Sequence, residues 1–372
     1  MAYYRLPEKE LRAYCEAVMG KYGFNEKQSR DIADILLTAD LQGLESHGVQ
    51  RLIRYHRGVK SGVIRPDAVP EVVHETPLSV VLDAHSAMGQ IAAVDAMERA
   101  IAKAKQYGFG AAVVRNSNHF GIAGYYAKMA CDEGLLGMAF TNSEAIMVPT
   151  FGKLAMIGSN PIAVAMPAEP YDFFFDASTT VVTRGKLEMY NKMEKPLPEG
   201  WALNKDGKAS TDAPDVLKNI VAKNGGGIMP LGGNTETLGS HKGYGYGMLC
   251  EIFCSIFSQG TTSSHVNVGG KSGTCHGFMA VDPSIFGDPA AIKEHFSAYL
   301  QELRDAPKAD GQTRIYTHGE KEILAYEDRM KNGIDVNINT VAETADMANY
   351  LGTDSESYLG KVDVSGHESS YK

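Results

Sequence analysis

The 372-residue sequence predicts an α/β fold built on a mixed sheet. Segments that suit buried strands alternate along the chain with segments whose apolar residues recur at helical spacing, and this alternation is typical of α/β proteins. Several connections between the predicted strands are too short to hold a crossover helix, which excludes a purely parallel sheet. Hydrophobic residues make up 44% of the chain and charged residues 22%, so the composition is that of a globular protein.

Three helices are predicted in the first 62 residues. The second is capped by Asn25, with Gln28 three residues later, and it stops at Gly43. The third begins near Ser46, which is a suitable N-cap residue. The first helix carries an apolar stripe formed by Leu11, Tyr14, Cys15, Val18 and Met19.

From about residue 68 the chain changes to strands that alternate with helices. Residues 79–84 predict a strand, and residues 90–108 predict a helix that ends at Gly108. The segment 245–260 is apolar on nearly every face, so it predicts a buried central helix. Further strands are predicted at 109–115, 135–142, 162–168, 173–179 and 276–282, and a further helix at 288–305 with Ile292, Phe296, Leu300 and Leu303 directed inward.

The charge and the cysteines exclude several classes of partner and location. The formal net charge is -9, so no basic surplus exists to neutralise phosphates, and neither nucleic acid nor a membrane is an expected partner. No apolar run approaches the ~18–20 residues that a membrane-spanning helix needs. The N-terminal stretch lacks the apolar region of a secretory signal. Five scattered cysteines do not form a disulfide framework, which predicts a reducing, cytoplasmic location.

Neither a phosphate-binding loop nor a metal site is indicated. No G-x-G-x-x-G follows a predicted strand, and residues 243–247 alternate glycines without the third one at the required spacing. A nicotinamide enzyme with this sequence would therefore not be an ordinary Rossmann enzyme. Cys250 and Cys254 lie one helical turn apart, but no second pair converges on them, so we expect no metal.

His47 and Arg51 form the most informative pair of polar residues. On a helix that starts at Ser46 they would share one face. An arginine can grip a carboxylate through two hydrogen bonds, and a histidine can take or give a hydroxyl proton near neutral pH. The pair therefore suits a carboxylate substrate that bears an alcohol or a ketone. The alternative is that His47 caps a helix and Arg51 is a solvated surface residue.

Two further polar residues stand at the ends of apolar strands. His119 lies on a strand-to-helix connection followed by Gly121 and Gly124, and it is either a site histidine or a satisfied loop histidine. Asp176 ends a run of three phenylalanines, where a carboxylate needs a partner. It either orients a catalytic histidine or caps the helix that follows.

Taken together, these segments resemble the second-type malate/L-lactate dehydrogenase family, also called sulfolactate dehydrogenase-like. The stretches "SHG" at 46–48 and "SNHFG" at 117–121 are specific when they occur together. The matches run in family order from about residue 40 to 322 and so cover most of the chain. They are "SHGVQRL", "NSNHFGIAGYYAKMA", "SNPIAVAMP", "DAST", "GWALNKDGKAST", "MPLGG", "HKGYGYGMLCEI", "GFMAVDP" and "HGEKE".

The resemblance implies a non-Rossmann NAD(P)-binding fold whose mixed, largely antiparallel sheet is flanked by helices. An N-terminal helical segment, residues 1–70, would pack with the C-terminal segment 313–372. Residues 71–312 would form the α/β core that binds cofactor and substrate. Family members are usually homodimers, so we expect a homodimer.

The resemblance also implies the roles of individual residues. His47 matches the histidine assigned as the acid/base, and Ser46 and Arg51 match its neighbours in the substrate pocket. His119 matches a second histidine, assigned as a proton acceptor in some members and as a contact to cofactor or substrate in others. Contacts to the cofactor are implied for His119, Asp176, Ala177, Ser178, Thr179, His241, Lys242, Gly319 and Glu320.

We therefore predict hydride transfer between a nicotinamide cofactor and a small 2-hydroxy acid, with malate and oxaloacetate as the expected pair. Lactate, sulfolactate, a keto-sugar acid or a cyclic imino acid are alternative substrates within the family, and an inactive ligand-binding homologue is a further alternative. NAD is the predicted coenzyme and NADP the alternative. The segments that match cofactor contacts offer Lys242 beside the acidic Asp176 and Glu320, and no basic cluster for a 2′-phosphate.

Overall fold

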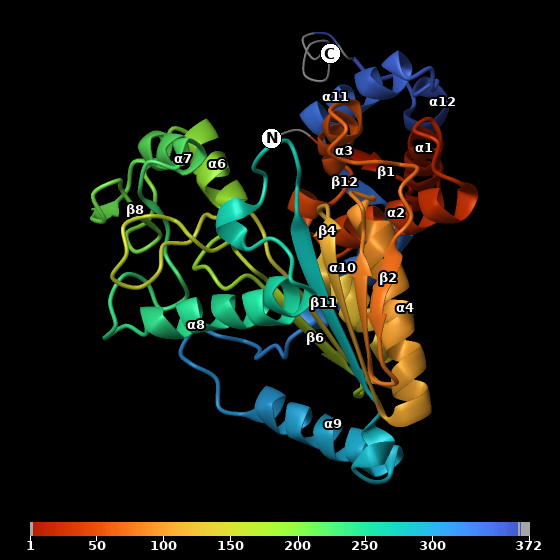
Figure 1. The fold of residues 1–372 in the computed structure, drawn as a ribbon, viewed down its shortest axis with the longest axis vertical. Helices are drawn as coiled ribbons and strands as arrows, with labels where there is room; N and C mark the ends of the chain where they lie inside the picture. The colour runs from red at the N-terminus through yellow and green to blue at the C-terminus, as the bar shows by residue number, and fades with distance from the viewer. Residues whose placement is uncertain (1–2, 364, 366–372) are drawn as a thin grey trace.

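The computed structural model describes residues 3–363 and 365, and it confirms the α/β class. Its largest sheet has seven strands in the order β2-β3-β4-β11-β5-β6-β7 (Figure 1). Within this sheet β3 and β4 are parallel, and every other neighbouring pair is antiparallel. The predicted mixed, largely antiparallel sheet is therefore confirmed. Its strands are β2 (Glu71–Glu75), β3 (Ser79–Asp83), β4 (Phe109–Ser117), β5 (Leu136–Thr141), β6 (Ile162–Met166), β7 (Phe173–Ala177) and β11 (Thr274–Val281).

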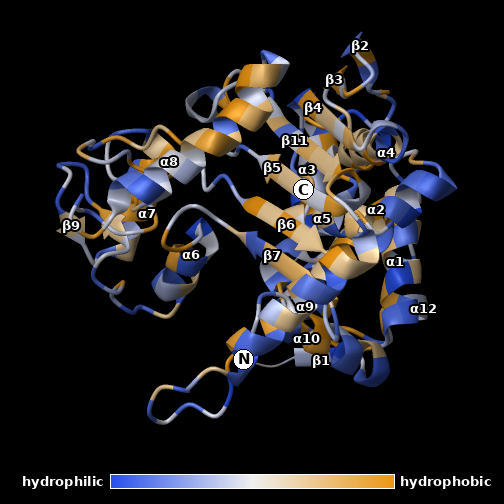
Figure 2. Cartoon of the chain, turned by 90° about the horizontal axis from the view of Figure 1, so that it is seen from below, coloured by the Kyte–Doolittle hydropathy of each residue, from blue (hydrophilic) through white to orange (hydrophobic). Residues whose placement is uncertain are grey.

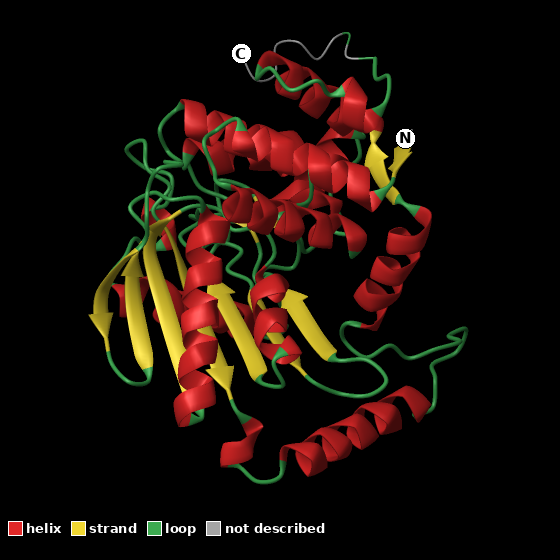
Figure 3. Ribbon diagram, turned by 90° about the vertical axis from the view of Figure 1, so that its right-hand side faces the viewer, coloured by secondary structure: helices red, strands yellow, loops and turns green. Residues whose placement is uncertain are grey.

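Helices α4 (Gly89–Tyr107) and α5 (Ala123–Asp132) pack on one face of this sheet (Figure 3). The packing is so close that a Cβ on Gly110 would lie 2.0 Å from a carbonyl oxygen of α4, and a Cβ on Gly137 would lie 2.1 Å from one of α5. Glycine is the residue that permits this approach. The apolar sheet face and the two helices form one buried core, which fixes where β4 ends and α5 begins.

The opposite face of the sheet is covered by α8 (Ser240–Glu251) and by the π-helical turn Ile252–Ile256 that follows it. The inner side of this segment packs Cys250 and Cys254 against the sheet. Its outer side is exposed, so the predicted buried central helix is wrong (Figure 2). An all-round apolar composition does not say whether the chain itself covers the second side. The exposed apolar side chains are Tyr246, Met248, Leu249, Ile256 and Phe257.

The two ends of the described chain pack together. Strand β1 (Tyr3–Leu6) pairs with β12 (Ile334–Asn337) in antiparallel register. The N-terminal helices share a core with the C-terminal ones, and the Tyr14 hydroxyl donates to the carbonyl of Thr344. The domain boundaries themselves stay a prediction, and the last residues of the segment 313–372 lie outside the described residues. The helices of this layer are α1 (Glu8–Gly20), α2 (Glu26–Leu41), α3 (Arg51–Lys60), α11 (Ile338–Tyr350) and α12 (Glu356–Leu359).

The sequence predicted α1 and α2 well, because short-range signals determine both. Every residue of the predicted apolar stripe of α1 is buried. The Asn25 side chain accepts the N–H of Gln28, and the Gln28 side chain accepts the N–H of Asn25, which is the predicted capping arrangement.

The remaining elements form a small lobe and an outlying helix, except for α10 (Glu320–Asn332), which packs against α2. The lobe has its own apolar core and a three-stranded sheet in the order β10-β8-β9. Helix α9 (Pro289–Asp305) lies beneath the main sheet in Figure 1, and of its four residues predicted to point inward, only Leu300 is buried. The other elements are β8 (Ala202–Leu203), β9 (Ala209–Ser210), β10 (Gly227–Ile228), α6 (Arg184–Lys192) and α7 (Ala213–Ala222).

Candidate active site

His119 lies on the connection between β4 and α5, as predicted. Its Nδ1 lies 3.0 Å from the hydroxyl of Tyr55 and 3.4 Å from the backbone nitrogen of Gly121. The Tyr55 hydroxyl in turn accepts a hydrogen bond of 2.7 Å from Nε2 of Gln90. Among the described residues, no hydrogen bond reaches Nε2 of His119. One ring nitrogen is therefore anchored by the protein, and the other is left for a ligand.

The residue before His119 is fixed by its side chain. The amide of Asn118 donates to the carbonyl oxygens of Ser86 at 3.0 Å and Ala87 at 2.9 Å. Asn118 is buried, and a Cβ on Gly89, the first residue of α4, would lie 2.3 Å from the carbonyl oxygens of both Asn118 and His119. The backbone that carries the imidazole is thus clamped between a loop and a helix end.

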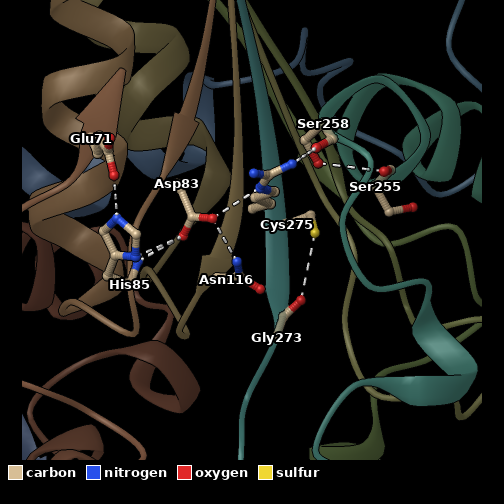
Figure 4. A network of polar contacts seen from close by, with 9 residues as sticks. Glu71, Asp83, His85, Asn116, Ser255, Ser258, Gly273 and Cys275 are labelled. Carbon is tan, nitrogen blue, oxygen red and sulfur yellow. Dashed lines mark hydrogen bonds and ion pairs between the residues drawn. The ribbon is translucent and has the colours of Figure 1, made fainter. Parts of the chain in front are cut away.

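Asp83 supports the same segment from the end of β3. Its carboxylate accepts hydrogen bonds from the guanidinium of Arg115 at 2.9 Å and from the amide of Asn116 at 2.8 Å (Figure 4). It also accepts the backbone N–H of His85 at 3.0 Å. His85 and Asn116 have φ angles of 49° and 54°, which are left-handed values that side chains rarely adopt. Such strain persists only where surrounding contacts hold it, and Asp83 supplies those contacts.

His47 lies in a short 3-10 helix, Glu45–His47, and not in the α-helix α3. The predicted helix start at Ser46 is therefore wrong, and α3 begins five residues later. The cause is Asp40, a buried side chain whose carboxylate accepts the N–H of Val49 at 2.8 Å. In a helix that N–H would donate to a carbonyl one turn earlier, so the side chain diverts the backbone. The hydroxyl of Ser46 instead lies 2.9 Å from Nδ1 of His47.

The structure brings the two predicted histidines together. The rings of His47 and His119 lie with their centroids 5.5 Å apart and their planes 23° from parallel. Burial, followed by the positive charges of Arg51 and Arg54, lowers the pKa of His47 to about 3. Burial and the same two guanidinium groups hold the pKa of His119 well below its ordinary value. Both imidazoles are therefore neutral at physiological pH.

Two arginines on α3, Arg51 and Arg54, lie close enough to the histidine pair for their charges to lower the pKa of both imidazoles. Arg51 donates from Nε to the carbonyl of Ser46 at 2.5 Å. This hydrogen bond joins Arg51 to the segment of His47, although α3 begins later than predicted. Among the described residues neither Arg51 nor Arg54 forms an ion pair. Burial and the charge of Arg54 lower the pKa of Arg51. Two like charges that lie close together, neither of them in an ion pair among the described residues, are a suitable site for an anion.

Asp176 does not contact either histidine through a hydrogen bond in the described structure. Its carboxylate accepts the N–H of Gly124 at 2.7 Å, in the first turn of α5. It therefore caps the helix that starts just after His119, and not the helix that follows Asp176 itself, which was the predicted alternative. Burial raises its pKa to about 6, and the hydrogen bond from Gly124 opposes that rise. Its predicted role as an orienting partner of a histidine has no support from these contacts.

The predicted cofactor stretch after β7 joins three separate loops. The N–H and the hydroxyl of Thr179 both donate to the carbonyl of Ser159, at 2.8 and 3.0 Å. The carbonyl of Thr179 accepts the N–H of Leu231 at 3.0 Å. Ala177 and Ser178 precede it and are partly exposed. The stretch is thus held rigidly at the edge of the main sheet.

The other predicted cofactor residues lie in different surroundings. His241 and Lys242 are exposed in the first turn of α8, and the described structure shows no contact between them and the histidine pair. Gly319 has a φ of 97° and precedes α10. Glu320 is fully buried and pairs with Arg314 at 2.6 Å, so its carboxylate has a partner within the protein. The coenzyme contacts of all four stay predictions.

Sequence reasoning missed the residues that hold the histidines. Tyr55 and Gln90 come from α3 and α4, and no spacing in the sequence links them to His119. Asp83 is equally remote in sequence from the segment that it supports. Arg54 differs from these residues, because it follows Arg51 by one helical turn and the sequence already indicates it, with Arg184, as an alternative clamp for the carboxylate.

Within residues 3–363 no group of three or more histidine, cysteine, aspartate or glutamate side chains is arranged to hold a metal ion. Over the same range no helix has both the length and the apolar character that crossing a membrane requires.

The sequence matches the family model for malate/L-lactate dehydrogenase over residues 6–344. It is 40% identical to the malate dehydrogenase of Pyrococcus horikoshii over 95% of this chain and 97% of that protein. It is 33% identical to the L-sulfolactate dehydrogenase of Methanocaldococcus jannaschii, over 95% of this chain and 98% of the relative.

A solved structure is similar over the same extent. The crystal structure of malate dehydrogenase from Entamoeba histolytica superimposes with a TM-score of 0.91 and 34% identity, and it covers 95% of this chain and 99% of that chain. The family match, the relatives and the fold therefore agree with the resemblance found in the sequence motifs. The chain belongs to the malate/L-lactate dehydrogenase family, and it is a 2-hydroxy acid dehydrogenase.

Proposed function

We propose that this protein interconverts malate and oxaloacetate with a nicotinamide coenzyme, at a site formed by His47, His119, Arg51 and Arg54. The observation that carries the proposal is the pair of arginines without ion-pair partners beside two neutral histidines. The malate dehydrogenases among its relatives support the choice of substrate.

The arginines account for a substrate with two carboxylates. Arg51, joined to the turn of His47 through Ser46, binds the carboxylate next to the reacting carbon. Arg54 lies one helical turn further along the same face and binds the second carboxylate. The L-sulfolactate dehydrogenases among the relatives make sulfolactate the second candidate, because a sulfonate is also an anion that Arg54 could bind.

The histidines account for the proton. In the oxidation direction the neutral imidazole of His47 accepts the hydroxyl proton of malate. In the reduction direction the same group, once protonated, returns it. His119 contacts the oxygen on the reacting carbon through Nε2, the ring nitrogen that no described protein group occupies. The partly exposed turn of His47 lets its proton exchange with water.

The chemistry of the site fits a nicotinamide ring. Both imidazoles are neutral, and no described carboxylate pairs with the nearby arginines, so a polar ring can stack there without competing ions. When bound, the coenzyme takes or supplies the hydride at C2 of the acid. The residues proposed to hold it are His119, Asp176, Ala177, Ser178, Thr179, His241, Lys242, Gly319 and Glu320.

The order of the main sheet supports a coenzyme-binding fold that is not of the Rossmann type. A Rossmann sheet is mostly parallel, with the pyrophosphate at a glycine-rich turn after its first strand. Here the first three strands of the sheet contain the parallel pair β3–β4, and the remaining pairs are antiparallel. We also retain residues 71–312 as the core that carries the site.

Replacement of Arg54 by leucine tests the substrate assignment. The wild-type protein should reduce oxaloacetate with a kcat/KM well above that for pyruvate, which has one carboxylate. Arg54→Leu should lower kcat/KM for oxaloacetate by about 10-fold or more, the equivalent of one charge-assisted hydrogen bond, and leave that for pyruvate nearly unchanged. Initial rates with oxaloacetate, pyruvate and sulfopyruvate measure both ratios. A wild-type preference that survives in Arg54→Leu would remove Arg54 from substrate recognition.

NADH is the proposed coenzyme. The two acidic residues that favoured it in the sequence, Asp176 and Glu320, have other partners in the structure. Asp176 caps α5 and Glu320 pairs with arginine, so neither is free to repel a 2′-phosphate. NADH is supported by Arg184, a basic residue that could have bound the 2′-phosphate of NADPH. Arg184 is paired with Glu188 and Glu144 instead. Dissociation constants for NADH and NADPH at one ionic strength should favour NADH. Tighter NADPH binding that weakens steeply with salt would show a basic site that this assignment overlooks.

We also propose that the protein is a homodimer in the cytoplasm. The exposed apolar side of α8 and its π-helical turn is the type of surface that a second copy covers, since monomers rarely expose such patches. Sedimentation equilibrium should give twice the chain mass of 40.2 kDa. The cytoplasm is supported by the five cysteines, which are all free and buried.

A further inference from the structure

A buried chain of hydrogen bonds ends on His119. It begins at the amide of Gln90, which donates to the hydroxyl of Tyr55 at 2.7 Å, and it continues from that hydroxyl to Nδ1 of His119 at 3.0 Å. Gln90 is 0% exposed and Tyr55 is 1% exposed. The chain is therefore closed to water at its far end.

Such a chain can run in two directions, and each direction puts the imidazole proton on a different nitrogen. If Gln90 donates to Tyr55, the single hydroxyl proton of Tyr55 is directed at Nδ1 of His119. In the reverse direction Nδ1 would donate to Tyr55, and Tyr55 to the Gln90 oxygen. Gln90 does not decide between them, because one amide atom stays without a partner in either case, as its oxygen does here.

The backbone of Gly121 decides the direction. Its N–H is directed at Nδ1 of His119 with a separation of 3.4 Å, and a backbone N–H can only donate. A proton on Nδ1 would set two donors against each other. Nδ1 is therefore an acceptor for both Tyr55 and Gly121, and the one proton of the neutral ring lies on Nε2.

We propose that Tyr55 and Gln90 are positioning residues that hold His119 as a neutral imidazole with its proton on Nε2, so that His119 donates a hydrogen bond to the oxygen at C2 of the substrate and does not accept the proton. The placement of the substrate oxygen rests on the proposed function. The tautomer rests on the hydrogen bonds alone. The lowered pKa of His119 supports the neutral state.

This division of labour follows from what each histidine can do. During oxidation the C2 hydroxyl loses its proton to His47 and C2 loses its hydride to the coenzyme, while the N–H of His119 stabilises the charge that develops on the oxygen. His119 has no free lone pair for the proton. The chain behind it ends at a buried amide, which cannot release a proton to water. His47 differs, because its neighbour Ser46 has a hydroxyl that can donate or accept and is exposed.

The first test is spectroscopic and needs no substrate. The full-length protein is labelled with ¹⁵N in its histidine rings, and the resonances of His119 are assigned by their loss in His119→Gln. The ¹⁵N shifts of protonated and unprotonated ring nitrogens differ strongly. We expect a proton on Nε2 of His119, with and without NADH. A proton on Nδ1 would overturn the proposal. Because catalysis is not measured, failure of the proposed malate activity would leave this result unaffected.

The second test reverses the chain with Gln90→Glu. The introduced carboxylate, when ionised, has no proton to donate, so Tyr55 donates to it, and His119 must donate from Nδ1. Loss of the Nε2 donor should lower kcat about 10²-fold, as removal of one such donor does in other enzymes. The protonated carboxyl group can donate as Gln90 does, so activity should be present below the pKa of the introduced group and lost above it.

The wild-type enzyme has no ionisable group at position 90, and Gln90→Met provides the uncharged control. That variant should keep the Nε2 proton of His119, because the N–H of Gly121 still faces Nδ1, and it should show none of the pH dependence of Gln90→Glu. If Gln90→Glu has the wild-type pH profile and keeps the Nε2 proton of His119, the chain from residue 90 through Tyr55 does not hold the tautomer, and the proposal is wrong.

Discussion

Replacing His47 with asparagine should lower kcat for oxaloacetate reduction at least ~10²-fold, the low end of the contribution of a general acid or base. Asparagine keeps a polar side chain of similar size near Ser46 but cannot carry a proton across the working pH range. The position of His47, 5.5 Å from His119 and beside Arg51, motivates the change. The Kd for NADH should stay the same, because the variant removes proton transfer and not coenzyme binding.

The pH dependence of the wild-type enzyme is a second test of His47 as the proton carrier. The pKa of His47 in the free protein is about 3, below its ordinary value, so the protonated form that reduction needs grows as pH falls toward that value. The kcat/KM for oxaloacetate should therefore rise as pH is lowered from about 8 to about 5. His47→Asn should lose this slope. Near-normal turnover in the variant, with the slope retained, would exclude His47 as the proton carrier.

Arg51→Lys should raise the KM for oxaloacetate about 10- to 100-fold, since a hydrogen bond to a charged group contributes roughly 1.5–3 kcal/mol. Lysine keeps the charge but cannot present two parallel N–H groups to a carboxylate. It would also lose the hydrogen bond to the carbonyl of Ser46 that ties α3 to the turn of His47. Steady-state kinetics with saturating NADH measure the change.

A matched control for this variant is Arg30→Lys on α2. Arg30 is exposed, pairs with Glu26 one turn away, and has no place in the proposed site. Its KM should equal that of the wild-type enzyme. If Arg51→Lys also leaves KM unchanged, the carboxylate is held elsewhere, and Arg54 becomes the first residue to examine.

Short-range signals explain why most elements could be predicted. The capping arrangement at Asn25 and the apolar stripe of α1 involve residues within one or two turns, so the sequence alone determines them. The strand that ends at Ser117 and the helix that follows it are equally local. The burial of α8 failed because it depends on what lies against the outer side of the helix. No residue inside 245–260 carries that information.

In the candidate site, too, the features that depend on nearby residues were predicted and those that depend on distant residues were not. His47, Arg51 and His119 were predicted from residue type and motif, and the structure does bring them together. His47 and Arg51 were expected to share one face of a single helix, and that expectation is wrong. Asp40 accepts the N–H of Val49, so no continuous α-helix joins the two residues. That hydrogen bond is buried and tertiary in origin, so helical spacing could not reveal it.

Long-range contacts account for the remaining differences. Asp176 accepts the N–H of Gly124, which is 52 residues away in sequence, so it caps a different helix from the one that the sequence suggested. Tyr55 approaches His119 from 64 residues away. Neither partner has a spacing that marks it. A sequence reading can therefore nominate the reactive groups, while the partners that set their protonation come from the fold.

The proposed malate dehydrogenase activity is tested most directly by the oxidation of L-malate with NAD⁺ by the purified protein, measured beside L-lactate and L-sulfolactate. We expect malate to have the highest kcat/KM, and NADH and oxaloacetate to form in equal amounts. Arg54→Leu should lose this preference, and His47→Asn should lose turnover. Faster oxidation of lactate than of malate, or no coenzyme reduction with any of the three acids, would contradict the proposed activity.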